Sequence, residues 1–346
     1  MQFVLFCKQP YSFDILRPLK DEIINLGHNY LWFVPENIKK KFPWIEDEHI
    51  TSSIKDVYSF KPDIIYVPGN EVPHYLRGLK VQVFHGFAGE KKGHFRIRKY
   101  FDMYCTPGPY FTERFKELAK KHGDFDVIET GWPKLDGIFT KKADIISEKK
   151  IILKKHNVNK IILYAPTFSP SLTSAKDLLG QFYRFKSNPD YLLLIKFHDL
   201  MDGKFINLYK KLAYENENIL FLDERNILKY ILLADLMISD TSSAVYEFLL
   251  LNKPVISFNT KSKHIRWNNI KNPEHLISTI NNIFINDTYS GQREWFINNY
   301  HPYYDGKSSQ RIVNETLNYI ENNPVPEKRN IPFLRKRKMI REFGRI

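Results

Sequence analysis

Cysteine is nearly absent from the chain, which has only Cys7 and Cys105. Each stands within an apolar stretch, Phe-Val-Leu-Phe-Cys and Asp-Met-Tyr-Cys. Two cysteines in such places cannot build a disulfide framework or a thiolate zinc site. A reducing compartment suits free thiols, so we expect a cytoplasmic protein.

Long hydrophobic runs are absent as well. No window approaches the ~20 apolar residues that a membrane-spanning helix requires. The apolar run at the N-terminus is too short for a signal peptide. If this protein meets a membrane, we expect it to lie on the surface.

Glycine-rich signatures are missing too, although the chain has 15 glycines. The spacing of a phosphate-binding P-loop does not occur, and no triple-glycine fingerprint follows the first predicted strand. The histidines are scattered and form no pattern typical of a metal site. We therefore expect neither a nicotinamide-dependent oxidoreductase nor a metal site, and no cofactor.

Basic charge and apolar side chains, by contrast, are plentiful. Of 346 residues, 43% are hydrophobic, and 52 Lys and Arg against 39 Asp and Glu give a formal net charge of +13. Such a charge favours an anionic partner: phosphate, acidic lipid or nucleic acid. Nucleic acid is disfavoured, because the basic excess is concentrated in the C-terminal tail and no nucleic-acid-binding motif is visible.

Short apolar runs alternate with amphipathic stretches along the whole chain, as in parallel strands joined by helices. A first series of strands is predicted at 2–7, 30–34, 63–67, 80–84, 102–105 and 126–129. A second series is predicted at 161–165, 191–197, 219–222, 235–238 and 254–258. The pattern predicts an α/β fold of two doubly wound, Rossmann-like domains, with the ligand in a central cleft between the carboxyl ends of their strands.

The domains are predicted at 1–150 and 151–324, followed by a tail at 325–346. The tail carries eight basic residues against two acidic ones, and apolar residues are interleaved with its charges. A basic amphipathic segment is typical of one that lies on a membrane surface. A terminal helix that packs on the first domain, with its charges in solvent, is the open alternative.

The segment Asp240-Thr241-Ser242-Ser243 stands between a predicted buried strand and a helix that contains Glu247. Backbone N–H groups at a helix start, together with three hydroxyls, suit a phosphate. Glu247, one turn later, is placed to accept hydrogen bonds from two ribose hydroxyls. These residues could instead only cap the helix, but three consecutive hydroxyls exceed what a cap needs.

His85 follows a predicted strand and precedes Gly86, with Lys91 in the same loop. A histidine at the carboxyl end of a strand is exposed to ligands, and its neutral imidazole can take a proton from an attacking hydroxyl. The lysines of the loop would attract an anionic substrate. The alternative is a turn histidine that bonds only its own loop.

His198 ends another predicted strand, with Lys196 two residues earlier. Both side chains would point to one face of that strand and offset charge on a departing phosphate. A core histidine bonded to the backbone is the alternative. The stretch 305–311, before the last long helix, offers Lys307 and Arg311 for phosphate binding.

Six short segments occur in order: His85-Gly86, Gly131-Trp-Pro133-Lys-Leu-Asp136, Tyr164-Ala-Pro166-Thr167-Phe, Lys196-Phe-His198, Ser239-Asp240-Thr241-Ser242-Ser243 and Asp305-Gly306-Lys307-Ser308-Ser309. Together they resemble the CDP-glycerol glycerophosphotransferase family, which builds teichoic acids and related phosphate-linked capsular polymers. Two positions depart from the family's pattern. Asp199 stands where proline usually follows the histidine, and Thr241 where an aromatic residue is frequent.

This resemblance implies a GT-B fold without an essential catalytic metal. It implies that His85 is the base that activates the acceptor hydroxyl and that His198 binds the donor diphosphate. Phosphate binding by Ser242 and Ser243, and by Lys307 or Arg311, is implied as well. The other expected substrate-binding residues are Gly86, Lys91, Pro133, Lys134, Pro166, Thr167, Lys196, Asp240, Thr241 and Glu247.

The implied reaction is attack of an acceptor hydroxyl on the β-phosphorus of CDP-glycerol, which releases CMP. A CDP-alditol that carries ribitol or another polyol could replace CDP-glycerol. The acceptor would be lipid-linked or a polyol-phosphate polymer. The basic tail would then hold a cytoplasmic, peripheral enzyme on the anionic inner face of the cell membrane.

Two other functions stay open. The Asp-Thr-Ser-Ser segment also resembles the diphosphate site of a GT-B glycosyltransferase or epimerase that uses a UDP-sugar. A noncatalytic protein that binds anionic polymer or membrane would share the basic charge, but it would release no CMP.

Overall fold

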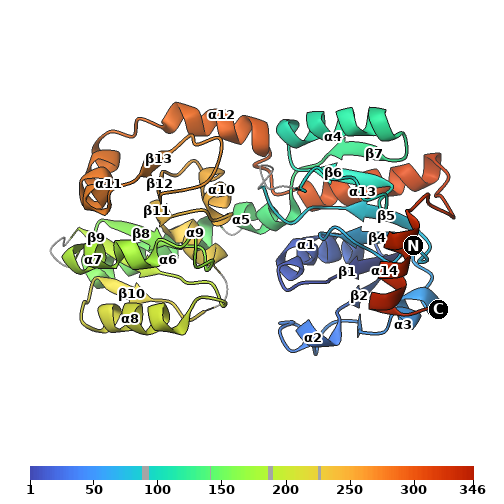
Figure 1. The fold of residues 1–346 in the computed structure, drawn as a ribbon, viewed down its shortest axis with the longest axis horizontal. Coiled ribbons are helices and arrows are strands. Elements are labelled where there is room, and N and C mark those ends of the chain that lie inside the picture. Colours follow the sequence, from blue (N-terminus) through green and yellow to red (C-terminus); the bar gives the residue numbers. More distant parts are fainter. Residues whose placement is uncertain (88–92, 141, 186–189, 225–226) are drawn as a thin grey trace. The chain divides into compact units, whose positions relative to one another are not determined.

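A computed structural model describes residues 1–87, 93–140, 142–185, 190–224 and 227–346. The chain divides into two compact units (Figure 1). Unit 1 combines Met1–Thr140 with Asn299–Ile346, and unit 2 is Lys141–Asn298. Each unit is a parallel sheet with helices packed on it, as the sequence predicts for two doubly wound domains.

The sheet of unit 1 has the strand order β3-β2-β1-β4-β5-β6-β7. Its strands are β1 (Gln2–Phe6), β2 (Asn29–Phe33), β3 (Ile50–Thr51), β4 (Ile64–Val67), β5 (Leu79–Gln82), β6 (Met103–Thr106) and β7 (Asp126–Glu129). Its helices are α1 (Ser12–Asn25), α2 (Glu36–Lys39), α3 (Ile54–Ser59), α4 (Pro109–His122), α5 (Asp136–Thr140), α13 (Ser308–Asn322) and α14 (Phe333–Phe343). The central strands β4, β5 and β6 are fully buried, as expected where helices cover both faces of a parallel sheet.

The sheet of unit 2 has the order β10-β9-β8-β11-β12-β13. Its strands are β8 (Lys160–Tyr164), β9 (Tyr191–Ile195), β10 (Ile219–Phe221), β11 (Leu236–Ser239), β12 (Val255–Phe258) and β13 (Asn268–Ile270). Its helices are α6 (Lys142–His156), α7 (Ala175–Phe185), α8 (Gly203–Tyr214), α9 (Leu228–Leu233), α10 (Ala244–Leu249), α11 (Leu276–Ile285) and α12 (Ser290–Tyr300), the last of which runs into unit 1. Apolar side chains of these strands and helices form one core cluster, which includes Ile162, Leu193 and Ile238.

All eleven predicted strands are confirmed, with ends that shift by one or two residues. The strands β3 and β13 were not predicted, because β3 has only two residues and β13, Asn-Asn-Ile, has a single apolar one. The structure places residues 299–324 in unit 1, whereas the sequence pattern assigned them to the second domain. They lie there because α13 buries Ile312 and Val313, and Thr316 bonds the Tyr66 hydroxyl of β4 at 2.6 Å.

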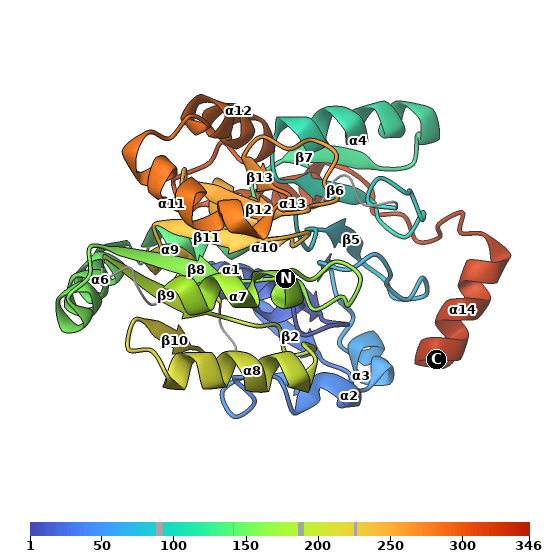
Figure 2. The ribbon, with the colours of Figure 1, turned by 60° about the vertical axis from the view of Figure 1, so that its left-hand side comes forward.

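The tail also packs on unit 1, which is the second of its two interpretations. Arg329 forms a buried ion pair with Asp102, and Met339 of α14 is fully buried. The ring of Phe343 lies against Phe6 at 5.7 Å between centroids. Figure 2 shows α14 in red with the C-terminus at its end. Within the described residues, no helix combines the length and apolar character needed to cross a bilayer.

Candidate functional site

The topological switch point of unit 1 lies between β1 and β4, because β2 pairs with one edge of β1 and β4 with the other. Open parallel sheets bind ligands outside the carboxyl ends of their strands at such a point. Segment 7–11 follows β1, and Pro68 follows β4. His85 follows β5, the neighbour of β4. The predicted base therefore belongs to the loops around the switch point.

The backbone turns sharply at His85. Strand β5 ends at Gln82, two residues earlier than predicted, and Phe84 has a left-handed φ of 56°. Gly86 has a φ of 157°, and a Cβ there would meet no atom within 4 Å. A non-glycine residue holds a left-handed φ only where its surroundings enforce it. This turn leaves the His85 side chain exposed instead of in the strand ladder.

Two contacts orient the His85 ring. Its Nδ1 lies 3.1 Å from the carbonyl oxygen of Pro68, and its centroid lies 5.2 Å from that of Tyr11. A carbonyl oxygen can only accept, so Nδ1 carries the proton and Nε2 the lone pair. A general base needs this lone pair to take a proton. Sequence reasoning missed Pro68 and Tyr11, because other strands bring them to His85.

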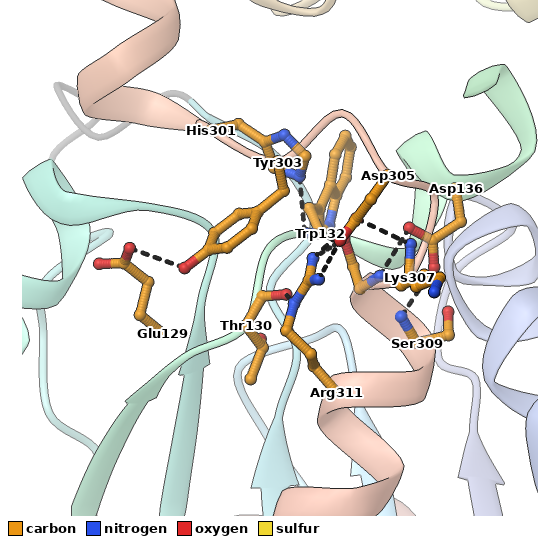
Figure 3. A network of polar contacts seen from close by, with 11 residues as sticks. Glu129, Thr130, Trp132, Asp136, His301, Tyr303, Asp305, Lys307, Ser309 and Arg311 are labelled. Carbon is orange, nitrogen blue, oxygen red and sulfur yellow. Dashed lines mark hydrogen bonds and ion pairs between the residues drawn. The ribbon is translucent and has the colours of Figure 1, made fainter.

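Two predicted motifs, 131–136 and 305–309, meet in unit 1 (Figure 3). The Asp136 carboxylate accepts hydrogen bonds from the backbone N–H groups of Ser308 at 2.9 Å and Ser309 at 2.7 Å. Gly131 has a φ of 85°, and a Cβ on it would lie 2.4 Å from the Ser308 hydroxyl. Only glycine suits that position. The two motifs thus support each other across a separation of 172 residues.

The start of α13 therefore already holds a carboxylate of the fold, and phosphate binding by Lys307 or Arg311 stays a prediction. Its first two N–H groups donate to Asp136, whose negative charge already complements the helix dipole. Burial raises the pKa of Asp136, and the hydrogen bonds from Ser309 and Ser308 oppose this effect. Both serines are buried as well. A second anion would have to displace a carboxylate that belongs to the fold.

Arg311 is held by its own domain (Figure 3). Its guanidinium donates to the carbonyl of Thr130 at 2.8 Å and to the Asp305 carboxylate at 2.6 Å, and this pairing lowers the pKa of Asp305. The same group lies 4.2 Å from the centroid of the Tyr303 ring. Lys307 is exposed, and its ammonium has no ion pair with another described residue. Of the two predicted phosphate-binding cations, Lys307 is the accessible one.

His301 is a candidate that the sequence analysis did not single out. It is 2% exposed, and its Nε2 accepts a hydrogen bond from the backbone N–H of Trp132 at 3.0 Å. Burial lowers the pKa of His301 to about 4, so the ring is neutral at pH 7. The Trp132 indole donates to the carbonyl of Phe84, the residue before His85, at 3.3 Å. His301 thus positions the loop that carries the predicted base.

Pro133 and Lys134 lie in a short 3-10 helix, Pro133–Leu135. Pro133 is buried at the first helical position, where its missing N–H is not needed. It shapes the turn, and its predicted contact with substrate stays a prediction. The Lys134 ammonium lies 5.4 Å from the centroid of the Trp132 ring.

Unit 2 repeats this layout, with its switch point between β8 and β11. Thr167 follows β8, His198 follows β9 and Asp240 follows β11. The predicted donor-side residues therefore come from three adjacent strands of one sheet, at its carboxyl edge.

Asp240 is 1% exposed and is committed to its own domain. Its carboxylate accepts from the backbone N–H of Thr167 at 2.8 Å, and from the N–H and hydroxyl of Ser174 at 2.8 and 2.9 Å. Burial raises the pKa of Asp240 to about 6, although these hydrogen bonds favour the charged form. Asp240 therefore holds the loop after β8, and its contact with substrate stays a prediction.

The hydroxyls after Asp240 keep donors for a ligand. Thr241 Oγ1 accepts from the N–H of Lys261 at 3.0 Å, and Ser242 Oγ accepts from the N–H of Ala244 at 3.3 Å. Each hydroxyl used as an acceptor still has its own proton to donate. Ser243 is exposed and precedes α10. The Ser242 hydroxyl thus bonds the first N–H of α10, as the capping interpretation expects, and phosphate binding by this segment stays a prediction.

Glu247 lies within α10 and is 7% exposed. Pro166, two residues after the end of β8, is buried. Lys91 lies outside the described residues. Among those that the structure does describe, no three His, Cys, Asp or Glu side chains form a group that could hold a metal ion.

Lys196 and His198 do not share a strand face, because β9 ends at Ile195. Lys196 is 6% exposed, and its ammonium donates to the carbonyl of Phe197 at 2.5 Å. His198 is exposed. The predicted pairing of the two side chains by strand alternation is wrong, since the chain leaves the strand before either residue.

The His198 ring is oriented by its own loop. Its Nδ1 accepts from the backbone N–H of Leu200 at 3.1 Å, so in the neutral ring Nε2 carries the proton. The Phe168 ring lies 4.5 Å away between centroids. Desolvation lowers the pKa of His198, the Asp199 charge opposes this effect, and the Lys196 charge adds to it. At pH 7 the ring is therefore a hydrogen-bond donor and not a cation.

Residues 79–266, more than half of the chain, match the family described as CDP-glycerol:poly(glycerophosphate) glycerophosphotransferase. A teichoic acid poly(glycerol phosphate) polymerase of Bacillus spizizenii is 28% identical over 57% of this chain and 46% of its own length. A teichoic acid glycerol-phosphate primase of Bacillus subtilis is 28% identical over 66% of this chain and 60% of its own length. The chain thus spans about half the length of these curated relatives.

Solved structures agree on the fold. The wall teichoic acid polymerase TagF superposes with a TM-score of 0.67 at 17% identity, over 93% of this chain and 89% of that one. A UDP-GlcNAc 2-epimerase from Neisseria meningitidis, bound to UDP-GlcNAc, gives 0.65 at 14% identity, over 93% of this chain and 100% of that one. These likenesses confirm the predicted GT-B fold.

Proposed function

The chain belongs to the CDP-glycerol:poly(glycerophosphate) glycerophosphotransferase family, and on that premise we propose that it transfers glycerol phosphate from CDP-glycerol to an acceptor hydroxyl. The acceptor is a lipid-linked or polyol-phosphate chain of a cell-wall or capsular polymer. The observation that carries this proposal is the exposed His85 ring, which lies in the matched range at the carboxyl edge of unit 1 and whose Nδ1 faces the Pro68 carbonyl, so that the lone pair is on Nε2.

In the proposed reaction, the acceptor oxygen attacks the β-phosphorus of CDP-glycerol. A new P–O bond forms, the bond from that phosphorus to the bridging oxygen breaks, and CMP leaves with the bonding electrons. His85 Nε2 takes the proton of the hydroxyl. The Pro68 carbonyl stabilises the imidazolium that results, because Nδ1–H already points at it.

Unit 2 is proposed to hold the donor. His198 Nε2–H and the hydroxyls of Thr241, Ser242 and Ser243 are donors that suit the diphosphate oxygens. Glu247 is proposed to accept hydrogen bonds from the ribose. Lys307 of unit 1 is proposed to offset charge on the phosphate that departs.

We also propose that the enzyme is cytoplasmic and lies on the anionic inner face of the cell membrane. Helix α14 supports this, because Phe333 is 69% exposed and Leu334 77% exposed. Arg337 and Arg341 of the same helix are exposed too. Exposed apolar side chains beside cations are what an anionic lipid surface attracts.

The first test is CMP release from CDP-glycerol by the purified protein, with a lipid-linked or short polyol-phosphate acceptor. We expect release that depends on acceptor and disappears in His85→Ala. CDP-ribitol runs in parallel to identify the alditol. Release only from CDP-ribitol would change the donor and keep the reaction class.

A UDP-sugar reaction is the necessary comparison, because a UDP-sugar epimerase shares the fold. Turnover of the UDP-sugar alone would replace the proposed function with the second enzyme class. Binding of anionic polymer without turnover of any donor, unchanged in His85→Ala, would identify a noncatalytic protein.

Membrane binding is tested by flotation with vesicles of neutral lipid, alone or mixed with anionic phosphatidylglycerol. We expect flotation with the anionic vesicles only, and its loss in Phe333→Ser with Leu334→Ser. Tyr214→Ser is the matched control, since Tyr214 is 93% exposed on unit 2. Equal flotation of both variants would refute the role of α14.

A further inference from the structure

A cavity of about 370 Å³ lies in unit 1 beside the carboxyl ends of β1 and β2. Phe33 of β2 and Phe343 of α14 form part of its wall, together with Lys8, Asn37, Ser52 and Glu342. None of these residues belongs to the motifs that the sequence analysis singled out. The tail, which follows the predicted second domain in sequence, thus completes a cavity of the first one.

The charges that line this cavity cancel. The Lys8 ammonium lies 2.6 Å from the Glu342 carboxylate and 2.7 Å from that of Glu71. These two partners raise the pKa of Lys8 against the opposing effect of burial. A cation paired twice has little attraction left for a phosphate. The cavity therefore suits a neutral ligand.

Its polar groups suit hydroxyls. The Ser52 hydroxyl donates to the carbonyl of Val34 at 2.6 Å, so its oxygen can still accept. The Asn37 amide is exposed and makes no hydrogen bond with another described residue, which leaves both a donor and an acceptor. Gln9 adds a second exposed amide. Amides beside aromatic rings form the mixed surface that a polar ligand with an apolar face requires.

The cavity is joined to the base through one short segment. Gln9 lines it, and Tyr11, two residues on, lies against the His85 ring. Its other wall is the last turn of α14, the helix that exposes Phe333 and Leu334.

We infer that this cavity binds a neutral, hydroxylated group of the acceptor, a sugar ring or an uncharged polyol unit, and so holds the acceptor near His85. That the ligand is part of the acceptor rests on the proposed function. That it is neutral and hydroxylated rests on the cavity alone. The two sources of hydroxyls are distinguished by the probes.

The direct test measures binding of methyl N-acetyl-β-glucosaminide and of ribitol to the full chain by saturation-transfer NMR. Asn37→Trp fills the cavity, and Lys40→Trp puts the same bulk on the same short segment outside it. We expect at least one probe to bind the wild type and Lys40→Trp, and about tenfold weaker binding to Asn37→Trp. The probe that binds identifies a sugar or a polyol.

Asn37→Ala is the second variant, in case Asn37→Trp fails to fold. It removes the amide and leaves the cavity open. We expect binding about three- to tenfold weaker, the loss of a hydrogen bond or two. Failure of both probes to bind the wild type, or equal binding to all four proteins, would overturn the inference.

A kinetic measurement separates this inference from the proposed function. If CMP is released, Asn37→Trp should raise KM for the acceptor about tenfold and leave KM for CDP-glycerol unchanged. An unchanged acceptor KM would overturn the inference while the transferase stands. If no CMP is released, the NMR result still decides about the cavity.

Discussion

Each unit places a histidine after a strand near its switch point, on opposite sides of that point in the two sheets, and the two rings are oriented in opposite ways. His85 of unit 1 donates from Nδ1 to the Pro68 carbonyl, which leaves the lone pair on Nε2. His198 of unit 2 accepts at Nδ1 from the Leu200 N–H, which leaves the proton on Nε2. One backbone group, a carbonyl or an N–H, thus decides whether the outer nitrogen is a base or a donor.

The buried carboxylates of the two units, in contrast, do the same work. Asp136 accepts from two N–H groups at the start of α13, and Asp240 from two N–H groups and a hydroxyl around the loop after β8. Each ties a distant segment to the carboxyl edge of its sheet. The units therefore share this kind of support and differ in the tautomer of their exposed histidine.

The largest effect is expected for the base. His85→Ala and His85→Gln should both lower kcat by about 10²–10⁴, because neither side chain can take a proton. CMP release at saturating donor measures this. His275→Ala, at an exposed histidine of unit 2, serves as the control and should keep wild-type activity. Substantial activity in His85→Gln would mean that the ring acts only as a hydrogen-bonding group and does not take the proton.

Replacement of the supporting carboxylates is expected to cost stability in both units. Asp240→Asn and Asp136→Asn each replace one acceptor oxygen with an NH₂ group, which then faces N–H donors. We expect each substitution to lower the free energy of unfolding by about 2–3 kcal/mol. Urea unfolding measures this. CMP affinity should fall in Asp240→Asn only, because that loop belongs to the proposed donor side. Equal CMP affinity in both variants would remove the distinction.

A fall in pH should change the contributions of His301 and Asp240 to the free energy of unfolding in opposite directions. The pKa of His301 is about 4 in the folded state, against the ordinary value of 6.5. The neutral, buried ring therefore contributes to the free energy of unfolding in full above pH 6.5, and this contribution is lost as the pH falls toward 4. It amounts to about 3 kcal/mol. His301→Gln, whose amide oxygen can accept from Trp132, should flatten that slope in urea unfolding followed against pH.

The pKa of Asp240 is raised from 3.8 to about 6, so its contribution has the opposite sign. It is complete below pH 3.8 and is lost as the pH rises through about 6. The difference in unfolding free energy between the wild type and Asp240→Asn should therefore be smaller near pH 6 than near pH 4. Parallel slopes in Asp240→Asn and His301→Gln would contradict the opposite signs.

A smaller effect is expected at the donor histidine. His198→Ala should raise KM for CDP-glycerol about tenfold, and His198→Gln less than about threefold, because the glutamine amide can replace Nε2–H as a donor. The contrast with His85→Gln, which should not recover activity, separates the two roles. A His198→Gln enzyme as impaired as His198→Ala would argue against a donor role.

The smallest effect is expected for Lys307. Lys307→Ala should raise KM for the donor about threefold and only at low salt, because an exposed charge is screened. Lys307→Arg should restore the wild-type KM. Arg311→Ala is the matched contrast: it should cost stability, since Arg311 bonds Thr130 and Asp305. A salt-independent loss in Lys307→Ala would indicate a packing role instead.

Local patterns accounted for most of the fold. Apolar runs predicted eleven of the thirteen described strands, and the order of short motifs predicted the family and its GT-B fold. The same patterns could not show that α13 returns to the first domain, because its apolar face looks alike whichever sheet it covers. Nor could they separate Asp240, which is buried, from Ser243, which is exposed.

The sequence by itself determined the two-domain class, the chemistry of the motif residues and the presence of a histidine at each carboxyl edge, because period and composition are local properties. Only the tertiary structure decided which nitrogen of each histidine carries the proton, that Asp136 accepts hydrogen bonds from the start of α13, and that α14 completes a cavity beside β2. Each of these depends on a partner that comes from a distant segment or from the exact path of a loop, and no spacing along the chain records it.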